Sequence, residues 1–223
     1  MANKDNVTWT NKDNLDYYEN IPVALLQHYA TIGGFDNGCD IDLIYNDYIA
    51  HANSVIEAGA GYGRVIQCLL DRGYRGKITA IERSKQFYNF MRDKFDNKAN
   101  IINCSIDDFV CTEPADIVLW MWSNISEWPQ PEQAKILKHL AGFCKKGGFL
   151  ILDTISHLIT PLNVSMSDTQ SYIAETEYGT AYGYTPTTDQ IDLYAEKIGA
   201  ISVAHISYIT TTGRNRLIHV LGF

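Results

Sequence analysis

The residues with the clearest potential for chemistry form a glycine-rich segment, Glu57-Ala-Gly-Ala-Gly-Tyr-Gly63. It follows an apolar run at residues 54–57, which predicts a short strand, and precedes residues 64–72, whose apolar spacing predicts a helix. Glycines at such a turn permit positive φ and let a ligand approach the backbone closely. The segment therefore predicts a ligand site at the carboxyl edge of a parallel sheet, where α/β proteins bind their ligands.

A second acid, Glu82, follows the next predicted strand at residues 77–81. A carboxylate in that place can accept hydrogen bonds from both hydroxyls of a ribose. The glycine spacing counts against two common nucleotide motifs. A dinucleotide fingerprint would need glycine where Arg64 stands, and a phosphate-binding P-loop would need Gly-Lys-Ser/Thr, which the chain lacks.

Alternating strands and helices surround these motifs and must hold them in place. Repeated units of this kind predict an α/β fold, in which helices cover both faces of a parallel sheet. Residues 200–211 and 216–223 predict two more strands around a Thr-Gly-Arg-Asn turn, which would form an antiparallel hairpin. The other predicted elements are strands at 100–104, 116–121 and 149–153 and helices at 85–95 and 131–145.

Together these features resemble the class I S-adenosylmethionine-dependent methyltransferases. The resemblance runs from about residue 52 to residue 153 and includes the segments 101–109, 115–119 and 137–152. It implies a doubly wound, seven-stranded, mostly parallel sheet in the order 3-2-1-4-5-7-6, with the last strand antiparallel and helices on both faces. It also implies one methyltransferase domain over residues 1–223 that uses S-adenosyl-L-methionine as its cofactor.

The family pattern implies a place for each part of the cofactor. The methionine part would lie on the backbone around Gly59 and Gly61, with its amino group near Glu57 and the ribose on Glu82. Many relatives carry an acid where Ser105 stands, so this chain departs from the family at the adenine. The other implied cofactor-binding residues are Gly63 in the glycine loop, Ser105, Ile106 and Asp107 near the adenine, and Met121 and Trp122 near the methyl group.

No signature in the chain identifies a catalytic residue. Met121-Trp-Ser-Asn124 replaces the Asn/Asp-Pro-Pro-Tyr of amino-methylating nucleic-acid enzymes. Ser126-Glu-Trp128 resembles the acidic loop of protein arginine methyltransferases, but the Gly-Tyr and the second acid of that loop are missing. Alignment of acceptor and methyl group can supply most of the acceleration. The candidate catalytic residues are His157 as a base, and Tyr17 and Tyr18, which would either close over the cofactor or pack their helix.

Two segments outside the family pattern are expected to meet the acceptor: an N-terminal helical cap over residues 1–50 and a substrate-side insertion over 155–186. Residues 147–196 contain no Lys or Arg. Acids and aromatic rings together suit a cationic or amine-bearing small molecule and N-methylation. The alternative is a solvated, tyrosine-rich hairpin flap with an acidic outer face. The residues concerned are Asp153, Asp168, Glu175, Glu177, Asp189, Asp192, Glu196, Tyr172, Tyr178, Tyr182 and Tyr184.

The composition of the chain disfavours several kinds of partner and site. The net charge of −8 disfavours a nucleic-acid partner, which usually requires a basic patch. No run approaches the roughly 18 apolar residues of a membrane span, and no signal peptide is evident, so we expect a cytoplasmic protein without a membrane partner. The spacing of the six histidines and five cysteines predicts no metal site.

Two other functions fit the same motifs. One is a regulatory or partner module that binds the cofactor without transferring a methyl group. The other is a nicotinamide-dependent oxidoreductase, which the glycine spacing disfavours.

Trp120 and Trp122 are two residues apart at the end of the predicted strand 116–121. Alternate residues of a strand point to the same face, so both side chains are expected on one face, either in the core or beside the ligand.

Overall fold

The computed structural model describes residues 9–156, 164–166 and 170–223. Seven strands form the main sheet, in the order β3-β2-β1-β4-β5-β10-β9. The first five strands in the chain run parallel, and β10 is antiparallel to both of its neighbours, β5 and β9. These strands are β1 (Ser54–Ala58), β2 (Lys77–Glu82), β3 (Asn100–Asn103), β4 (Ala115–Trp120), β5 (Cys144–Ile155), β9 (Ser202–Ile209) and β10 (Asn215–Gly222).

The predicted α/β fold with a mostly parallel seven-stranded sheet is confirmed. The predicted numbering 3-2-1-4-5-7-6 becomes 3-2-1-4-5-10-9, because three strands of a second sheet come between β5 and the terminal hairpin. They form a separate antiparallel sheet of β6 (Val164–Met166), β7 (Ser171–Thr176) and β8 (Gly179–Tyr184). Strands β7 and β8 bury neither face fully, so their sequence lacks the apolar alternation that marks a half-buried strand.

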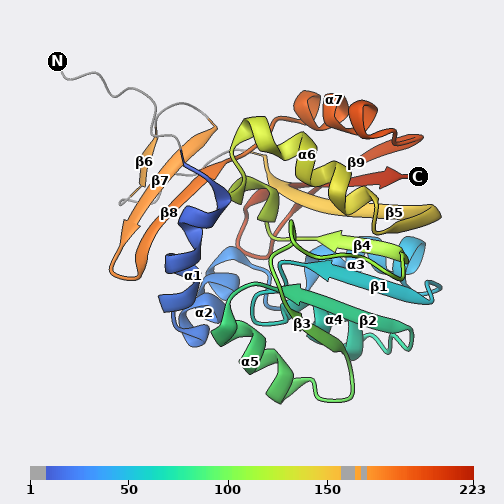
Figure 1. Ribbon diagram of the computed structural model, residues 1–223, viewed down its shortest axis with the longest axis horizontal. Coiled ribbons are helices and arrows are strands. Elements are labelled where there is room, and N and C mark those ends of the chain that lie inside the picture. Colours follow the sequence, from blue (N-terminus) through green and yellow to red (C-terminus); the bar gives the residue numbers. More distant parts are fainter. Residues whose placement is uncertain (1–8, 157–163, 167–169) are drawn as a thin grey trace.

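Helices cover both faces of the main sheet because neighbouring strand residues point in opposite directions. Val55 and Leu119 face a core shared with the N-terminal helices and with α4 and α5, whereas Ile56 and Trp120 face α6 and α7. Figure 1 shows α6 and α7 together on one side of the sheet. The helices are α1 (Leu15–Asn20), α2 (Val23–Gly33), α3 (Cys39–Ile44), α4 (Arg64–Asp71), α5 (Lys85–Lys94), α6 (Gln130–Ala141) and α7 (Thr188–Ile198), with short turns η1 (Asn11–Asn14), η2 (Tyr45–Ile49) and η3 (Asn124–Glu127).

The N-terminal helices and the small sheet lie side by side, although they are far apart in the sequence (Figure 1). The buried side chain of Asn14 joins them. Its amide accepts from the backbone N–H of Tyr182 at 2.7 Å and donates to the carbonyl of the same residue at 3.1 Å. Asn14 thus pairs with β8 much as a neighbouring strand would.

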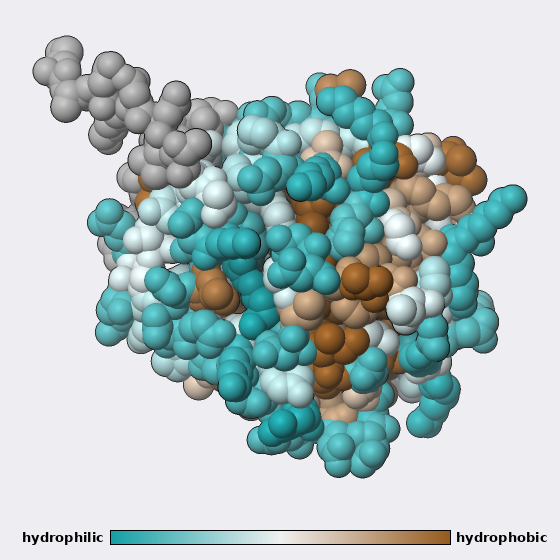
Figure 2. Space-filling view, in the orientation of Figure 1, coloured by the Kyte–Doolittle hydropathy of each residue, from teal (hydrophilic) through white to brown (hydrophobic). Residues whose placement is uncertain are grey.

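The surface in Figure 2 is largely hydrophilic, with smaller hydrophobic patches between the polar residues. The most exposed large apolar side chains in the described ranges are Ile201, Val110 and Ile209. None of the helices in these ranges has both the length and the apolar composition that a bilayer crossing requires.

Candidate functional site

A cavity of about 290 Å³ opens where β1, β2 and β4 end. The structure brings most of the predicted cofactor-binding residues to its wall, together with Tyr17 and Tyr18. Gly63 and Asp107 do not line the cavity, and His157 lies outside the described residues. The predicted residues on the wall are Glu57, Gly59, Gly61, Glu82, Ser105, Ile106, Met121 and Trp122.

The glycine loop turns with positive φ at every glycine, as the sequence predicted, but the three glycines differ in their surroundings. A Cβ on Gly61 would meet only Leu26 Cδ2, at 3.9 Å, so the loop is open on that side. A Cβ on Gly59 would lie 2.9 Å from the amide of Asn124, which donates to the Gly59 carbonyl at 2.9 Å. Gly61 is therefore the position where the backbone leaves most room for a ligand.

Gly63 and Asp107 have other structural roles. A Cβ on Gly63 would lie 3.1 Å from Met91 and even closer to the ring of Phe95, so this glycine lets α4 begin tightly against α5. Asp107 is exposed, and its carboxylate accepts a hydrogen bond from the hydroxyl of Ser105. The Cβ direction of Gly63 thus points to protein and the Asp107 side chain is exposed, so neither lines the cavity.

Glu82 is buried at the end of β2 and is held by two backbone donors. The N–H of Gly61 donates to Oε2 and that of Ser84 donates to Oε1, both at 2.7 Å. Burial raises the pKa of Glu82 to about 7, although these two hydrogen bonds work in the opposite direction. Because each carboxylate oxygen has a further lone pair, Glu82 can still accept hydrogen bonds from a ligand.

Glu57 is one of two buried residues in the described cavity wall that have a polar side-chain atom without a partner. Its side chain is buried, and within the described part of the chain its Oε2 has no hydrogen-bond partner. The nearby Arg64 is already engaged by Asp40, through two hydrogen bonds of 2.8 and 2.6 Å. Burial therefore raises the pKa of Glu57 to about 8, with Arg64 lowering it and Glu82 raising it further. A cationic donor in the cavity would relieve this carboxylate.

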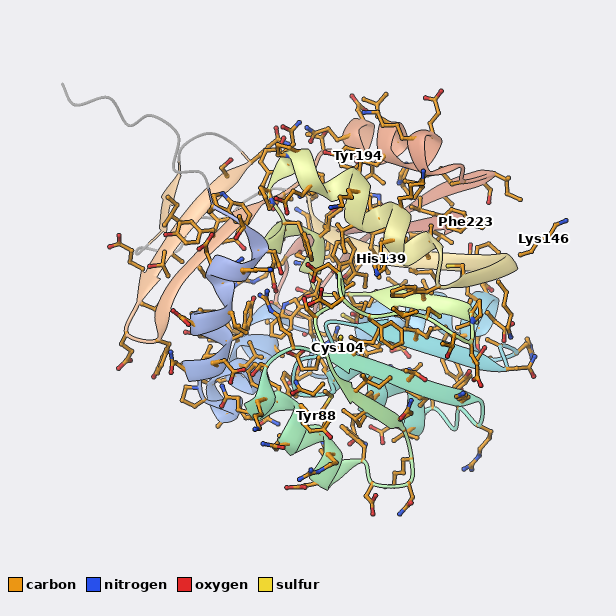
Figure 3. All side chains as sticks on the ribbon, in the orientation of Figure 1. Tyr88, Cys104, His139, Lys146, Tyr194 and Phe223 are labelled. Atoms are coloured by element: carbon orange, nitrogen blue, oxygen red, sulfur yellow. The ribbon has the colours of Figure 1, made fainter. Side chains whose placement is uncertain are left out.

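The loop after β3 carries Ser105 and Ile106 and is attached to α6. His139 Nε2 lies 2.9 Å from the carbonyl oxygen of Ile106. Figure 3 shows His139 and Cys104, the residue just after β3, toward the middle of the molecule, whereas Lys146 extends into solvent. Trp120, also on the wall, is fully buried, and its indole N–H has no partner among the described residues.

The segment after β4 turns sharply at the cavity. Trp122 and Ser123 have φ of 58° and 59°, a left-handed conformation that costs an ordinary residue roughly 1–2 kcal/mol. This turn separates the two tryptophans that alternation placed on one face: Trp120 packs toward α6, and Trp122 packs toward Phe35 and Tyr62. The prediction was wrong because β4 ends at Trp120, so strand periodicity does not reach Trp122.

Four tyrosines and a further acid also line the cavity. Tyr17, Tyr18, Tyr29 and Tyr172 come from α1, α2 and β7, and Glu127 comes from η3. Glu127 accepts a hydrogen bond from the Tyr18 hydroxyl and lies 3.4 Å from Arg83. Burial raises the pKa of Glu127, and burial together with the charge of Glu127 raises the pKa of Tyr172 to about 12. The pKa of Tyr17 and that of Tyr18 are raised by the same causes, so these hydroxyls stay protonated near neutral pH.

The acids that the sequence suggested for the acceptor lie elsewhere. Glu175 and Glu177 are exposed at the turn between β7 and β8, and neither lines the cavity. Asp153 is paired with Arg216, and Asp168 lies outside the described residues. Of the four tyrosines in the insertion, Tyr172 alone reaches the cavity wall. Sequence reasoning missed Arg83 and Arg216; for Glu127 the only signal was the Ser-Glu-Trp tripeptide.

Comparison with known proteins identifies a methyltransferase domain. Residues 55–148, the segment from β1 into β5, match the family model described as a methyltransferase domain. The chain therefore carries a methyltransferase domain, and solved S-adenosylmethionine-dependent methyltransferases share its fold. Within the described ranges of this domain, no group of three or more His, Cys, Asp or Glu side chains is placed to hold a metal ion.

One similar curated protein is the hybrid PKS-NRPS synthetase fsa1 of a Fusarium species. It is 27% identical over an alignment 212 residues long, which covers 81% of this chain and only 5% of the length of the synthetase. Two solved structures share the fold of the methyltransferase domain. The glycopeptide N-methyltransferase MtfA with bound S-adenosylmethionine is 15% identical, with a TM-score of 0.64, and the match covers 84% of this chain and 93% of that one. The amino pentose methyltransferase CalS10 of Micromonospora echinaspora is 11% identical, with a TM-score of 0.66, over 90% and 97% of the chains.

Proposed function

We propose that the chain transfers the methyl group of S-adenosylmethionine to a small-molecule acceptor, and that both ligands bind in the cavity beside the glycine loop. The observation that carries the proposal is the buried, unpartnered Oε2 of Glu57, next to the open side of Gly61. An uncompensated carboxylate in such a place is costly. The α-ammonium group of S-adenosylmethionine supplies the missing charge and the missing donors.

The other residues on the wall fit the remaining parts of this cofactor. We assign the ribose hydroxyls to Glu82, whose orientation its two backbone donors fix, and the adenine to the loop of Ser105 and Ile106. Met121 and Trp122 would border the methyl group. When bound, S-adenosylmethionine supplies a methyl group activated by a positive sulfur. The protein then has to align the acceptor with it and exclude water.

We further propose that the acceptor carries an amine and is methylated on nitrogen. Glu127, which also pairs with Arg83 at 3.4 Å, shares the cavity wall with the aromatic residues Tyr17 and Tyr172, and a carboxylate beside aromatic rings attracts cations. An amine must lose its proton before it reacts, and Glu127, whose pKa burial raises, is the acid best placed to receive it. The protonated hydroxyls of Tyr17 and Tyr18 favour an orienting role for these residues over a basic one.

Under this proposal the N-terminal helices and the insertion form the acceptor side of the domain. Tyr17 and Tyr29 reach the cavity from one of these segments and Tyr172 from the other. The names of two proteins with a similar fold support an amine acceptor: one is a glycopeptide N-methyltransferase and the other an amino pentose methyltransferase.

The test has two stages. Calorimetry first measures binding of S-adenosylmethionine and S-adenosylhomocysteine to the whole chain. Amines are then compared with alcohols and carboxylates of matched size, with S-adenosylhomocysteine formation as the readout. Failure to bind either cofactor form would overturn the proposal. Binding without turnover of any acceptor would favour a cofactor-binding module instead, and preferred turnover of alcohols or carboxylates would reject the amine.

A further inference from the structure

The turn that presents Trp122 to the cavity is held in an unfavourable backbone conformation. Trp122 and Ser123 are consecutive left-handed residues, and Asn97 is the only other non-glycine residue with positive φ in the described ranges. Bulky residues persist in this region only when their surroundings impose it. The contacts that impose it therefore control where the Trp122 ring lies.

A buried ion pair behind the turn provides those contacts. Asp153 lies on β5 and Arg216 on β10, where the antiparallel register pairs Asp153 with Ile218 and leaves Arg216 as its diagonal neighbour. Arg216 donates to Asp153 Oδ2 from Nε at 2.8 Å and from Nη2 at 2.5 Å, and the hydroxyl of Tyr208 adds a contact of 3.2 Å. The two side chains are 4% and 0% exposed.

Both members of the pair also bind the same residue of the turn. The backbone N–H of Ser123 donates to Asp153 Oδ1 at 2.9 Å, and Arg216 Nη2 donates to the hydroxyl of Ser123 at 2.7 Å. The guanidinium of Arg216 lies 4.7 Å from the ring centre of Phe35, against which Trp122 packs at 5.9 Å. The pair thus fixes the backbone of the turn and one surface beside the Trp122 ring.

We infer that Asp153 and Arg216 are positioning residues that hold Trp122 at the methyl side of the cavity. The inference rests on the proposed function. In that function the two residues would act by positioning Trp122, without contact with the reacting atoms. Stability alone does not explain a buried ion pair at this place, because buried ion pairs can often be replaced by apolar residues without loss of stability. Two hydrogen bonds, one from each member of the pair, instead converge on one strained turn next to the cavity.

The experiment follows Trp122 directly by fluorine NMR. The protein contains four tryptophans, so 5-fluorotryptophan labelling gives four resonances, and Trp122→Phe identifies the one of interest. In Asp153→Asn we expect this resonance to shift or broaden. We expect kcat to fall about tenfold or more, because small misplacements near reacting atoms are costly. The Kd of S-adenosylhomocysteine should stay within about threefold of the parent value, since Asp153 does not line the cavity and S-adenosylhomocysteine lacks the methyl group that Trp122 would border.

Asp116→Asn is the matched control. Asp116 is a carboxylate at the opposite end of β4, bound to Lys145 and to two backbone N–H groups, so its loss should leave the Trp122 resonance and kcat unchanged. If Asp153→Asn fails to fold, the variants Ser123→Ala and Ser123→Gly provide a second test. They separate the effect of the left-handed backbone strain at Ser123 from the effect of losing its hydroxyl contact with Arg216. Both lose the hydroxyl, but alanine retains the cost of the left-handed conformation and glycine does not. Alanine should therefore disturb the resonance more than glycine.

The inference is overturned if the Trp122 resonance in Asp153→Asn and Ser123→Ala matches that of the parent, or if it moves while kcat does not. It is also overturned if alanine and glycine at position 123 behave alike. If the parent protein turns over no acceptor, the proposed function fails, and the fluorine resonances still decide whether the pair positions Trp122.

Discussion

The backbone N–H of Gly61 donates to Oε2 of Glu82 at 2.7 Å, which ties the glycine loop after β1 to the acid that ends β2. The two strands are parallel neighbours, paired from Ser54 with Lys77 to Ala58 with Ile81, so their carboxyl ends meet at one edge. The hydrogen bond makes loop and acid a single unit. A change in either one is therefore expected to alter the cavity on both sides.

Gly61→Val should abolish binding of S-adenosylmethionine while the fold persists. The branched side chain would enter the open space beside the loop, where the proposed ligand approaches the backbone. Gly73→Val is the control, because Gly73 also has positive φ and open space around its Cβ position but does not line the cavity. Both variants should lose roughly 1–2 kcal/mol of unfolding free energy. Unchanged calorimetric affinity in folded Gly61→Val would exclude this site for the cofactor.

Glu82→Ala should weaken binding of S-adenosylmethionine by about 2–4 kcal/mol, the sum of two charge-assisted hydrogen bonds to the ribose. Glu82→Gln should lose less binding free energy than Glu82→Ala. It should still bind more weakly than the parent, because its amide N–H₂ would face the backbone N–H of Gly61 or Ser84, which is also a donor. Calorimetry at constant pH measures both. If both variants bind like the parent, Glu82 serves only the loop and the start of α5.

Cofactor binding should strengthen as pH rises from about 6 to 7.5. The pKa of Glu57 is raised to about 8 and that of Glu82 to about 7, so binding a cation in this interval releases protons. Titrations in buffers of different ionisation enthalpy count these protons, and Glu57→Gln should reduce their number. A pH-independent affinity with no proton release would contradict the assignment of Glu57.

The same two groups give a signed prediction for the ligand-free protein. Their folded-state pKa values lie above the ordinary value of 4.5, so the folded state holds protons that the unfolded state has lost. Their contribution is fully present below pH 4.5 and is lost as pH rises through about 7 to 8. Denaturant unfolding of Glu57→Gln should show a smaller loss of stability across this interval than the parent.

Glu127→Gln should lower kcat/KM for amine acceptors by about tenfold or more, because it removes the acid proposed to attract the amine and accept its proton. Matched uncharged acceptors should change little. Glu175→Gln is the control: it removes the same charge from an exposed position away from the cavity and should leave both classes unaffected. Equal losses for both acceptor classes in Glu127→Gln would indicate a structural role.

Asp40→Asn should cost about 3–5 kcal/mol of unfolding free energy, because it leaves the buried guanidinium of Arg64 without its partner. Asp42→Asn offers a comparison in the same helix. Asp42 pairs with Arg72, but its side chain is 62% exposed, so its loss should cost less than about 1 kcal/mol. Denaturant midpoints measure both, and similar small losses would show that Arg64 finds another partner.

The sequence by itself determined the parallel sheet, the glycine loop and the acid after β2. These features are local: strand periodicity, a glycine turn and a residue at a strand end are set by neighbours in the chain. Parallel pairing then brings successive strand ends to one edge, so Glu57, Gly61 and Glu82 could be grouped without knowledge of the packing.

The tertiary structure alone decided which tyrosines and which acid line the proposed acceptor side of the cavity, and what supports the turn behind it. Tyr17, Glu127 and Tyr172 come from three segments that only packing brings together, and Arg216 reaches Asp153 through the register of the last strand. Local pattern also does not show which way an acid points, so Glu175 looked suitable and Glu127 did not. The direction of a side chain outside a regular strand or helix depends on contacts between distant segments, as the left-handed turn at Trp122 illustrates.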